Sequence, residues 1–113
     1  MGNLLSSAIK MQNGAVATAT LQYELFTLGN AGTFQIYKNG SLYQSMFEDT
    51  ALVTITLNAG DTFYATIVSF AGTAIDYNVN GSFVTTYFDT SPTPTITASG
   101  GTTYKYTAYF GAL

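Results

Sequence analysis

Residues 53–68 decide the fold class; they run Val-Thr-Ile-Thr-Leu-Asn-Ala-Gly-Asp-Thr-Phe-Tyr-Ala-Thr-Ile-Val. Apolar and polar residues alternate from Val53 to Leu57, which is the period of a β-strand. The turn-forming segment 58–61 follows, and a second strand begins near Phe63. The stretch therefore predicts two strands joined by a tight turn, as in a hairpin. The second strand is apolar on both faces, so we expect it to be central in its sheet or covered on both sides.

Similar short strands recur along the rest of the chain. Asn39-Gly40 and Asn80-Gly81 are the strongest hairpin signals, because Asn and Gly tolerate the positive φ that a type I′ turn needs. The segment 89–94 interrupts the pattern, since its prolines cannot donate a backbone hydrogen bond. We expect an all-β fold: a single antiparallel β-sandwich, jelly-roll or immunoglobulin-like, of about eight strands over residues 15–113.

Two regions depart from simple strand alternation. Residues 1–14 form a short N-terminal arm, in which Leu4, Leu5 and Ile9 would line one side of a short helix. Segments 34–45 and 75–86 each contain an aromatic-rich strand, Asn-Gly-Ser and a returning strand. We interpret this echo as two similar hairpins rather than a duplicated domain, because ordinary turn chemistry accounts for it.

Charge is scarce in this chain. Charged residues make up 8% of the 113, against about 25% in an ordinary soluble domain. Obligate interfaces are depleted in charge and enriched in aromatic residues, so the composition favours a surface that is buried in an assembly. The alternative is an ordinary β domain solvated by its hydroxyl groups. The net charge of −3 and three scattered lysines argue against nucleic acid as a partner, and no apolar run is long enough for a membrane span.

The residues that usually carry out catalysis are missing. The chain has no His and no Cys, which removes the common bases, nucleophiles and soft metal ligands. Six acids remain, but they fall in different loops and strands without the spacing of a calcium loop. We therefore expect a protein that is not an enzyme and that uses no metal or other cofactor.

Tyrosine is abundant, with nine residues beside eight Phe. Tyr supplies a large contact area at low entropic cost, so it is frequent at interfaces. It also favours sheets intrinsically and can form a sugar-binding platform, and these two alternatives remain open. Together with the arm, the tyrosines that alternation places outward and one valine give the interface candidates: Leu4, Leu5, Ile9, Tyr37, Tyr43, Tyr64, Val68, Tyr87 and Tyr109.

Two resemblances suggest a setting. The run from Phe34 to Gly40 and the run from Val53 to Phe63 resemble strand-turn signatures of C1q/TNF-like jelly rolls, although residues 89–113 extend beyond where that family closes. The low charge, the richness in Thr, Ala, Tyr and Gly, and the absence of Cys resemble small β-sandwich virion proteins of bacteriophages.

These features lead to two expectations about function. The first is a structural protein of a virus particle, as a capsid-associated, vertex, spike or decoration protein. It would contact copies of itself or a major capsid protein. The second is an extracellular β-sandwich module that binds carbohydrate or a cell surface.

Overall fold

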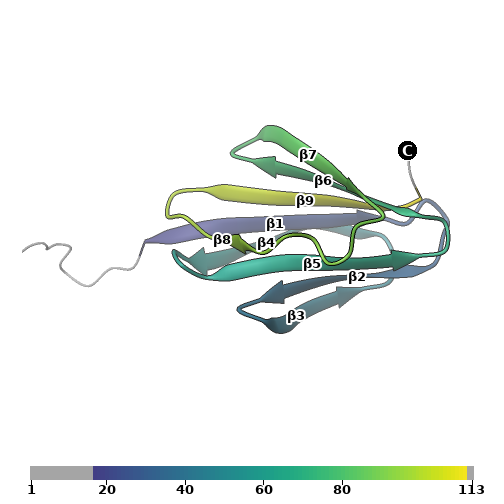
Figure 1. The fold of residues 1–113 in the computed structure, drawn as a ribbon, viewed down its shortest axis with the longest axis horizontal. Coiled ribbons are helices and arrows are strands. Elements are labelled where there is room, and N and C mark those ends of the chain that lie inside the picture. The colour runs from purple at the N-terminus through teal and green to yellow at the C-terminus, as the bar shows by residue number, and fades with distance from the viewer. Residues whose placement is uncertain (1–16, 112–113) are drawn as a thin grey trace, which may run out of the picture.

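The structure, a computed structural model, describes residues 17–111 and shows two β-sheets packed face to face (Figure 1). The described residues contain strands and no helix. The all-β sandwich expected from the sequence is therefore confirmed. The strands are β1 (Thr18–Phe26), β2 (Gly32–Lys38), β3 (Ser41–Met46), β4 (Thr50–Asn58), β5 (Thr62–Ser69), β6 (Thr73–Val79), β7 (Ser82–Phe88), β8 (Ile96–Thr97) and β9 (Thr103–Phe110).

The strands divide into a five-stranded sheet, in the order β4-β1-β9-β6-β7, and a four-stranded sheet, in the order β3-β2-β5-β8. All neighbouring strands are antiparallel except β1 and β9, which are parallel. Alternation along a strand shows which side chains are buried but not the direction of its neighbour, so the sequence pattern does not reveal this pair.

The segment 53–68 forms two strands, as predicted, but the prediction of a hairpin is wrong. β4 pairs with β1 in one sheet, and β5 pairs with β2 and β8 in the other. The turn between them is tight, because the Asp61 amide donates to the carbonyl of Asn58 at 3.0 Å. It crosses between the layers, so Leu57 and Phe63 enter the same core from opposite sheets.

The two Asn-Gly hairpins are confirmed. Asn39 and Gly40 adopt φ values of 53° and 79°, and Asn80 and Gly81 adopt 51° and 79°. Each hairpin stays within one sheet, where β2 pairs with β3 and β6 pairs with β7. These positive φ values explain why Asn and Gly occupy both turns.

The similarity between the two hairpins extends further than predicted. β2 begins at Gly32 and β6 at Thr73, and the same step of 41 residues separates β3 from β7 and β5 from β9. A register shift follows Ile36 in the first hairpin and Tyr77 in the second, again 41 residues apart. The segment from β2 to β5 is therefore repeated structurally by the segment from β6 to β9.

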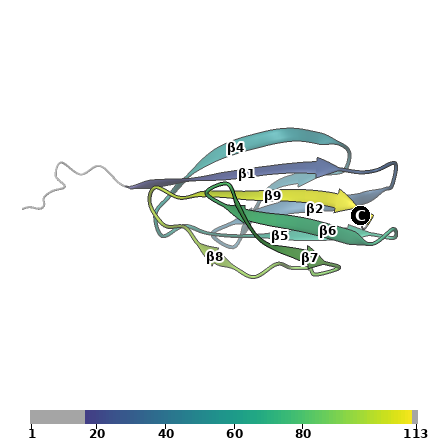
Figure 2. The same cartoon turned by 90° about the horizontal axis from the view of Figure 1, so that it is seen from above.

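The turns of the two repeats also correspond. The side-chain oxygen of Asn39 accepts from the Thr62 amide at 2.9 Å, and that of Asn80 accepts from the Thr103 amide at 2.9 Å. β4 and β8 are equivalent strands of the two repeats. β4 lies in the sheet that contains β6, β7 and β9 of the second repeat, and β8 lies in the sheet that contains β2, β3 and β5 of the first. This exchange interlocks the two repeats, with β1 inserted between β4 and β9 (Figure 2).

The core lies between the sheets and is rich in aromatic rings. Phe63 on β5 packs against Tyr104 and Tyr106 on β9, with ring centroids 5.0 and 5.9 Å apart. The Tyr23 hydroxyl on β1 donates to Oε1 of Gln44 on β3 at 2.5 Å, which joins the two sheets by a hydrogen bond. These contacts join the two sheets across the core.

Candidate interaction surface

Within residues 17–111, no strand covers the outer face of the four-stranded sheet. Along β5, Phe63, Ala65 and Ile67 point into the core, while the alternate side chains point outward. Among the outward residues Val68 is 67% exposed, and Phe70, just beyond the strand, is fully exposed. No strand of residues 17–111 lies over this face. β5 is thus central in its sheet, as expected, but one side of it is open.

A shallow apolar hollow lies at the end of this face. It has a volume of about 200 Å³ and is bordered by the start of β2 and the end of β5. β2 comes close to β5 here because Gly32 has no side chain: a Cβ at that position would overlap the carbonyl oxygen of Val68. Pockets for small molecules usually measure about 300–1,000 Å³, so this hollow fits a single apolar side chain better. It is lined by Ala31, Gly32, Thr33, Val68, Ser69 and Phe70.

The middle of the same face is polar and ordered. The Gln35 side chain accepts from the Thr66 hydroxyl at 2.9 Å and donates to the Ser45 hydroxyl at 3.1 Å. Beside it, Tyr37 and Tyr64 stack with ring centroids 4.8 Å apart and an interplanar angle of 3°. The face therefore combines a rigid aromatic and amide region with an apolar end.

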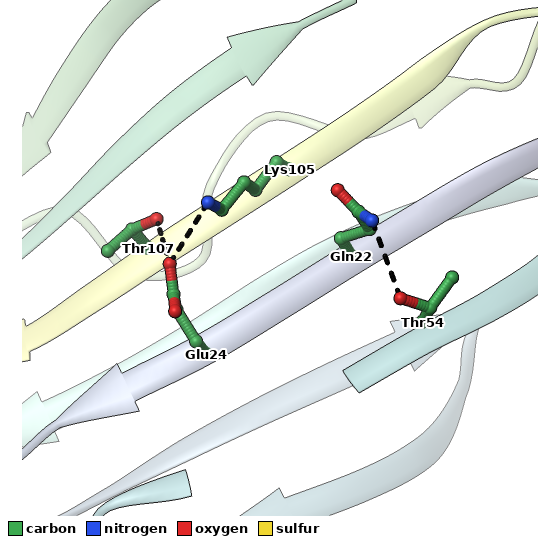
Figure 3. Close-up of polar contacts among 5 residues, drawn as sticks. All are labelled: Gln22, Glu24, Thr54, Lys105 and Thr107. Atoms are coloured by element: carbon green, nitrogen blue, oxygen red, sulfur yellow. Dashed lines mark hydrogen bonds and ion pairs between the residues drawn. The ribbon is translucent and has the colours of Figure 1, made fainter. Parts of the chain in front are cut away.

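The outer face of the five-stranded sheet is more polar (Figure 3). Lys105 on β9 forms an ion pair with Glu24 on β1 at 3.2 Å, and the Thr107 hydroxyl donates to the same carboxylate at 2.9 Å. A partly exposed pair of this kind contributes at most about 1 kcal/mol. Its main effect is to neutralise the centre of the face.

One end of this second face is aromatic. Phe26 and Tyr109 stack with ring centroids 5.5 Å apart. Burial raises the pKa of Tyr109, and the carboxylates of Asp76 and Glu24 add to the effect. Across the sheet, Tyr109 pairs with Ala74 on β6, and Ala74 pairs in turn with Phe88 on β7, which is exposed. Apolar groups thus gather at the same end of both sheets.

In the described part of the chain, five of the six acidic side chains have structural partners, all but Glu48. Asp61 accepts from the Asn58 amide and the Asn39 side chain, and both bonds lower its pKa. Asp89 accepts from the Thr73 amide at 2.8 Å, and Asp76 accepts from a threonine hydroxyl. Within residues 17–111, no three His, Cys, Asp or Glu side chains gather as a metal site would require.

The sequence-predicted interface residues are distributed over several places. Tyr37, Tyr64 and Val68 share the outer face of the four-stranded sheet. Tyr43 is exposed on the edge strand β3, and Tyr109 lies on the other outer face. Tyr87 is half-buried: it packs against the core, 6.2 Å from Tyr77 between ring centroids, and burial raises its pKa. Outside the described residues lie Leu4, Leu5 and Ile9.

Several exposed apolar residues were not among those predicted. Phe70 lies just after β5, where simple alternation no longer indicates a direction. Phe47 and Phe88 are both exposed and stand 41 residues apart, at equivalent points of the two repeats. Alignment of the two Asn-Gly-Ser hairpins by sequence would have revealed that pair.

The comparisons with known proteins find no matching family model, no similar curated protein and no similar solved structure. No helix in residues 17–111 is long and apolar enough to cross a membrane. Function must therefore be inferred from the surfaces of this chain.

Proposed function

We propose that the protein is a non-enzymatic structural protein of a virus particle, assembling through contacts with copies of itself or with a major capsid protein. The observation that carries the proposal is the open outer face of the four-stranded sheet, where Val68 and Phe70 are exposed beside an apolar hollow. Exposed apolar groups that gather with a concave site are typical of interaction surfaces.

The rest of the surface supports assembly in the same way. A free monomer is normally kept soluble by many charges of both signs, and this chain has three lysines and six acids in 113 residues. Large apolar side chains are exposed on both sheets and at their ends. They are Phe26, Leu28, Leu42, Tyr43, Phe47, Leu52, Val68, Phe70, Phe83, Val84 and Phe88.

The setting in a virus particle comes from the composition. Low charge, an excess of small hydroxyl residues and Tyr, and the absence of Cys are shared with small β-sandwich virion proteins of bacteriophages. In such a particle the protein would act as a capsid-associated, vertex, spike or decoration component. Its localisation would then be the virion.

The proposal is tested by the mass of the protein in solution. Light scattering at tens of micromolar should give a mass above 12.0 kDa, because the open face should bind another subunit. Val68→Lys should lower that mass, since a charge would have to be buried in the contact. The control is Ser82→Lys, at the exposed start of β7 and outside these apolar groups. A wild-type protein that stays monomeric contradicts assembly through contacts between copies.

A carbohydrate-binding module is a second candidate, and one observation favours it. The stacked Tyr37–Tyr64 pair lies beside the Gln35 amide, which combines aromatic rings with hydrogen-bonding groups on one open face. Binding on a glycan array that is lost in Tyr64→Ala would support it. An array without binding would leave the structural role as the better account.

A further inference from the structure

The edges of the two sheets differ in whether their backbone hydrogen-bonding groups have partners. The free side of β5 beyond β8 is closed by the preceding loop. The Thr93 amide donates to the carbonyl of Ala65 at 2.9 Å, the Ala65 amide donates to Oγ1 of Thr93 at 3.0 Å, and the Ile67 amide donates to Oγ of Ser91 at 3.1 Å. This loop saturates backbone groups that would otherwise be open to another strand.

β4 is an open edge. It pairs on one side with β1, and no other strand of residues 17–111 lies on its outer side (Figure 2). Its nine residues, Thr-Ala-Leu-Val-Thr-Ile-Thr-Leu-Asn, include no charge and no proline. Natural edge strands are usually protected by Lys, Pro, bulges or short length, and only the register shift near Thr50 interrupts β4.

We propose that β4 pairs antiparallel with β4 of a second copy, about a two-fold axis at Thr54, so that the two five-stranded sheets become one continuous sheet. This inference rests on the proposed function, because it names a partner and a contact for the assembly. In this register Thr54 lies opposite its own copy. Val53 lies opposite Ile55, and Leu52 lies opposite Thr56.

The strand is complementary to itself in this register. Val53 and Ile55 face the core side of the sheet and are only half-buried, so pairing would bring β-branched side chains of both copies together. A two-fold axis also brings each charge of a strand near the same charge of the second copy, and like charges repel. β4 contains none, so a second copy meets no repulsion along the strand.

The other exposed edges are less suited to this role. β3 and β7 have six and seven residues, against nine in β4. Each lies beside a register shift in its hairpin, after Ile36 and after Tyr77. In contrast, β4 is paired without interruption with β1 from Asn58 to Val53, and Thr54 lies in this regular part.

Single cysteines test the register directly, because the chain has no cysteine of its own. Opposite Cα atoms in an antiparallel pair are about 4.5–5.5 Å apart, within the range that a disulfide spans. Thr54→Cys should therefore form a disulfide-linked dimer under mild oxidation. Thr56→Cys should not, since four residues along the strand separate the two sulfurs by about 13 Å. A mixture of Leu52→Cys and Thr56→Cys should cross-link.

The matched controls lie away from β4. Thr97→Cys on exposed β8 should stay monomeric on a reducing-agent-free gel at the concentration that cross-links Thr54→Cys. Thr54→Lys should lower the solution mass of the full chain, whereas Ser82→Lys, at the exposed start of β7, should leave it unchanged. Circular dichroism spectra that match wild type would show that each variant is folded.

The outcomes separate this inference from the proposed function. If wild type is oligomeric, but Thr54→Cys does not cross-link and Thr54→Lys keeps its mass, the β4 contact is refuted and assembly through the outer faces stands. If wild type is monomeric, the β4 contact and self-assembly through the outer faces are both refuted. Cross-linking of Thr56→Cys as efficient as that of Thr54→Cys would refute the proposed register.

Discussion

Replacing Tyr23 by Phe is expected to lower the free energy of unfolding by about 1 kcal/mol. The Tyr23 ring is fully buried, and its hydroxyl donates to Oε1 of Gln44 across the sandwich at 2.5 Å. Phe keeps the ring and its packing, so the change removes the hydrogen bond alone. For a domain of this size, the loss corresponds to a fall of roughly 4 °C in Tm.

Urea unfolding at neutral pH would measure this change. A double-mutant cycle with Gln44→Ala should give a coupling of about 1 kcal/mol between the two side chains. Tyr43→Phe is the control, because Tyr43 is exposed on β3 and its change should fall within about 0.5 kcal/mol. Wild-type stability in Tyr23→Phe, or zero coupling to Gln44, would refute the role of this bond between the sheets.

The same substitution should change the alkaline limit of stability. Burial raises the pKa of Tyr23 to about 12, and the nearby Tyr43 hydroxyl adds to the effect. Because the folded state holds this proton more tightly than the unfolded state, the stabilisation is complete below pH 10 and is lost as the pH rises through about 12. The Tyr23→Phe variant should lose less stability than wild type over that range, as measured by urea midpoints.

The remaining predictions concern the turns between strands. Gly60→Ala and Gly101→Ala should each lower the free energy of unfolding by about 1 kcal/mol, because both glycines have positive φ, 94° and 78°, and no atom lies within 4 Å of an added Cβ. Gly60 and Gly101 stand 41 residues apart, at equivalent points of the two repeats. A large difference between the two variants in urea unfolding would contradict this equivalence. Asp61→Asn should reduce the loss of stability in acid. The folded state lowers the pKa of Asp61 below its ordinary value of 3.8, so the ionised carboxylate stabilises the fold above that value. This stabilisation is lost as the pH falls through the folded-state pKa. Identical acid unfolding of this variant and wild type would refute that role.

Local features of the fold were predictable, and its connections were not. The Asn-Gly turns and the alternation along β1 and β9 depend on neighbouring residues, so the sequence reveals them. The turn at 58–61 has hairpin chemistry, yet it crosses between sheets, because β4 pairs with β1 while β5 pairs with β2 and β8. Such choices depend on long-range packing that no local pattern records.

The surface was predictable only in part. Alternation placed Tyr37, Tyr64 and Val68 on one outward face, which the structure brings together. Alternation could not show that the Tyr87 side chain points toward the core. The register shift after Tyr77 changes which side chains of β7 face inward. Nor could alternation show that β4 lies at the edge of the five-stranded sheet, because the order of strands depends on long-range pairing.

The mass of the full chain in solution tests most directly whether these open surfaces bind another subunit. Sedimentation equilibrium at tens of micromolar should give a mass above the 12.0 kDa of one chain. Val68→Lys and Thr54→Lys should each reduce it. A wild-type mass of one chain across the whole concentration range would contradict assembly through either the outer face or β4.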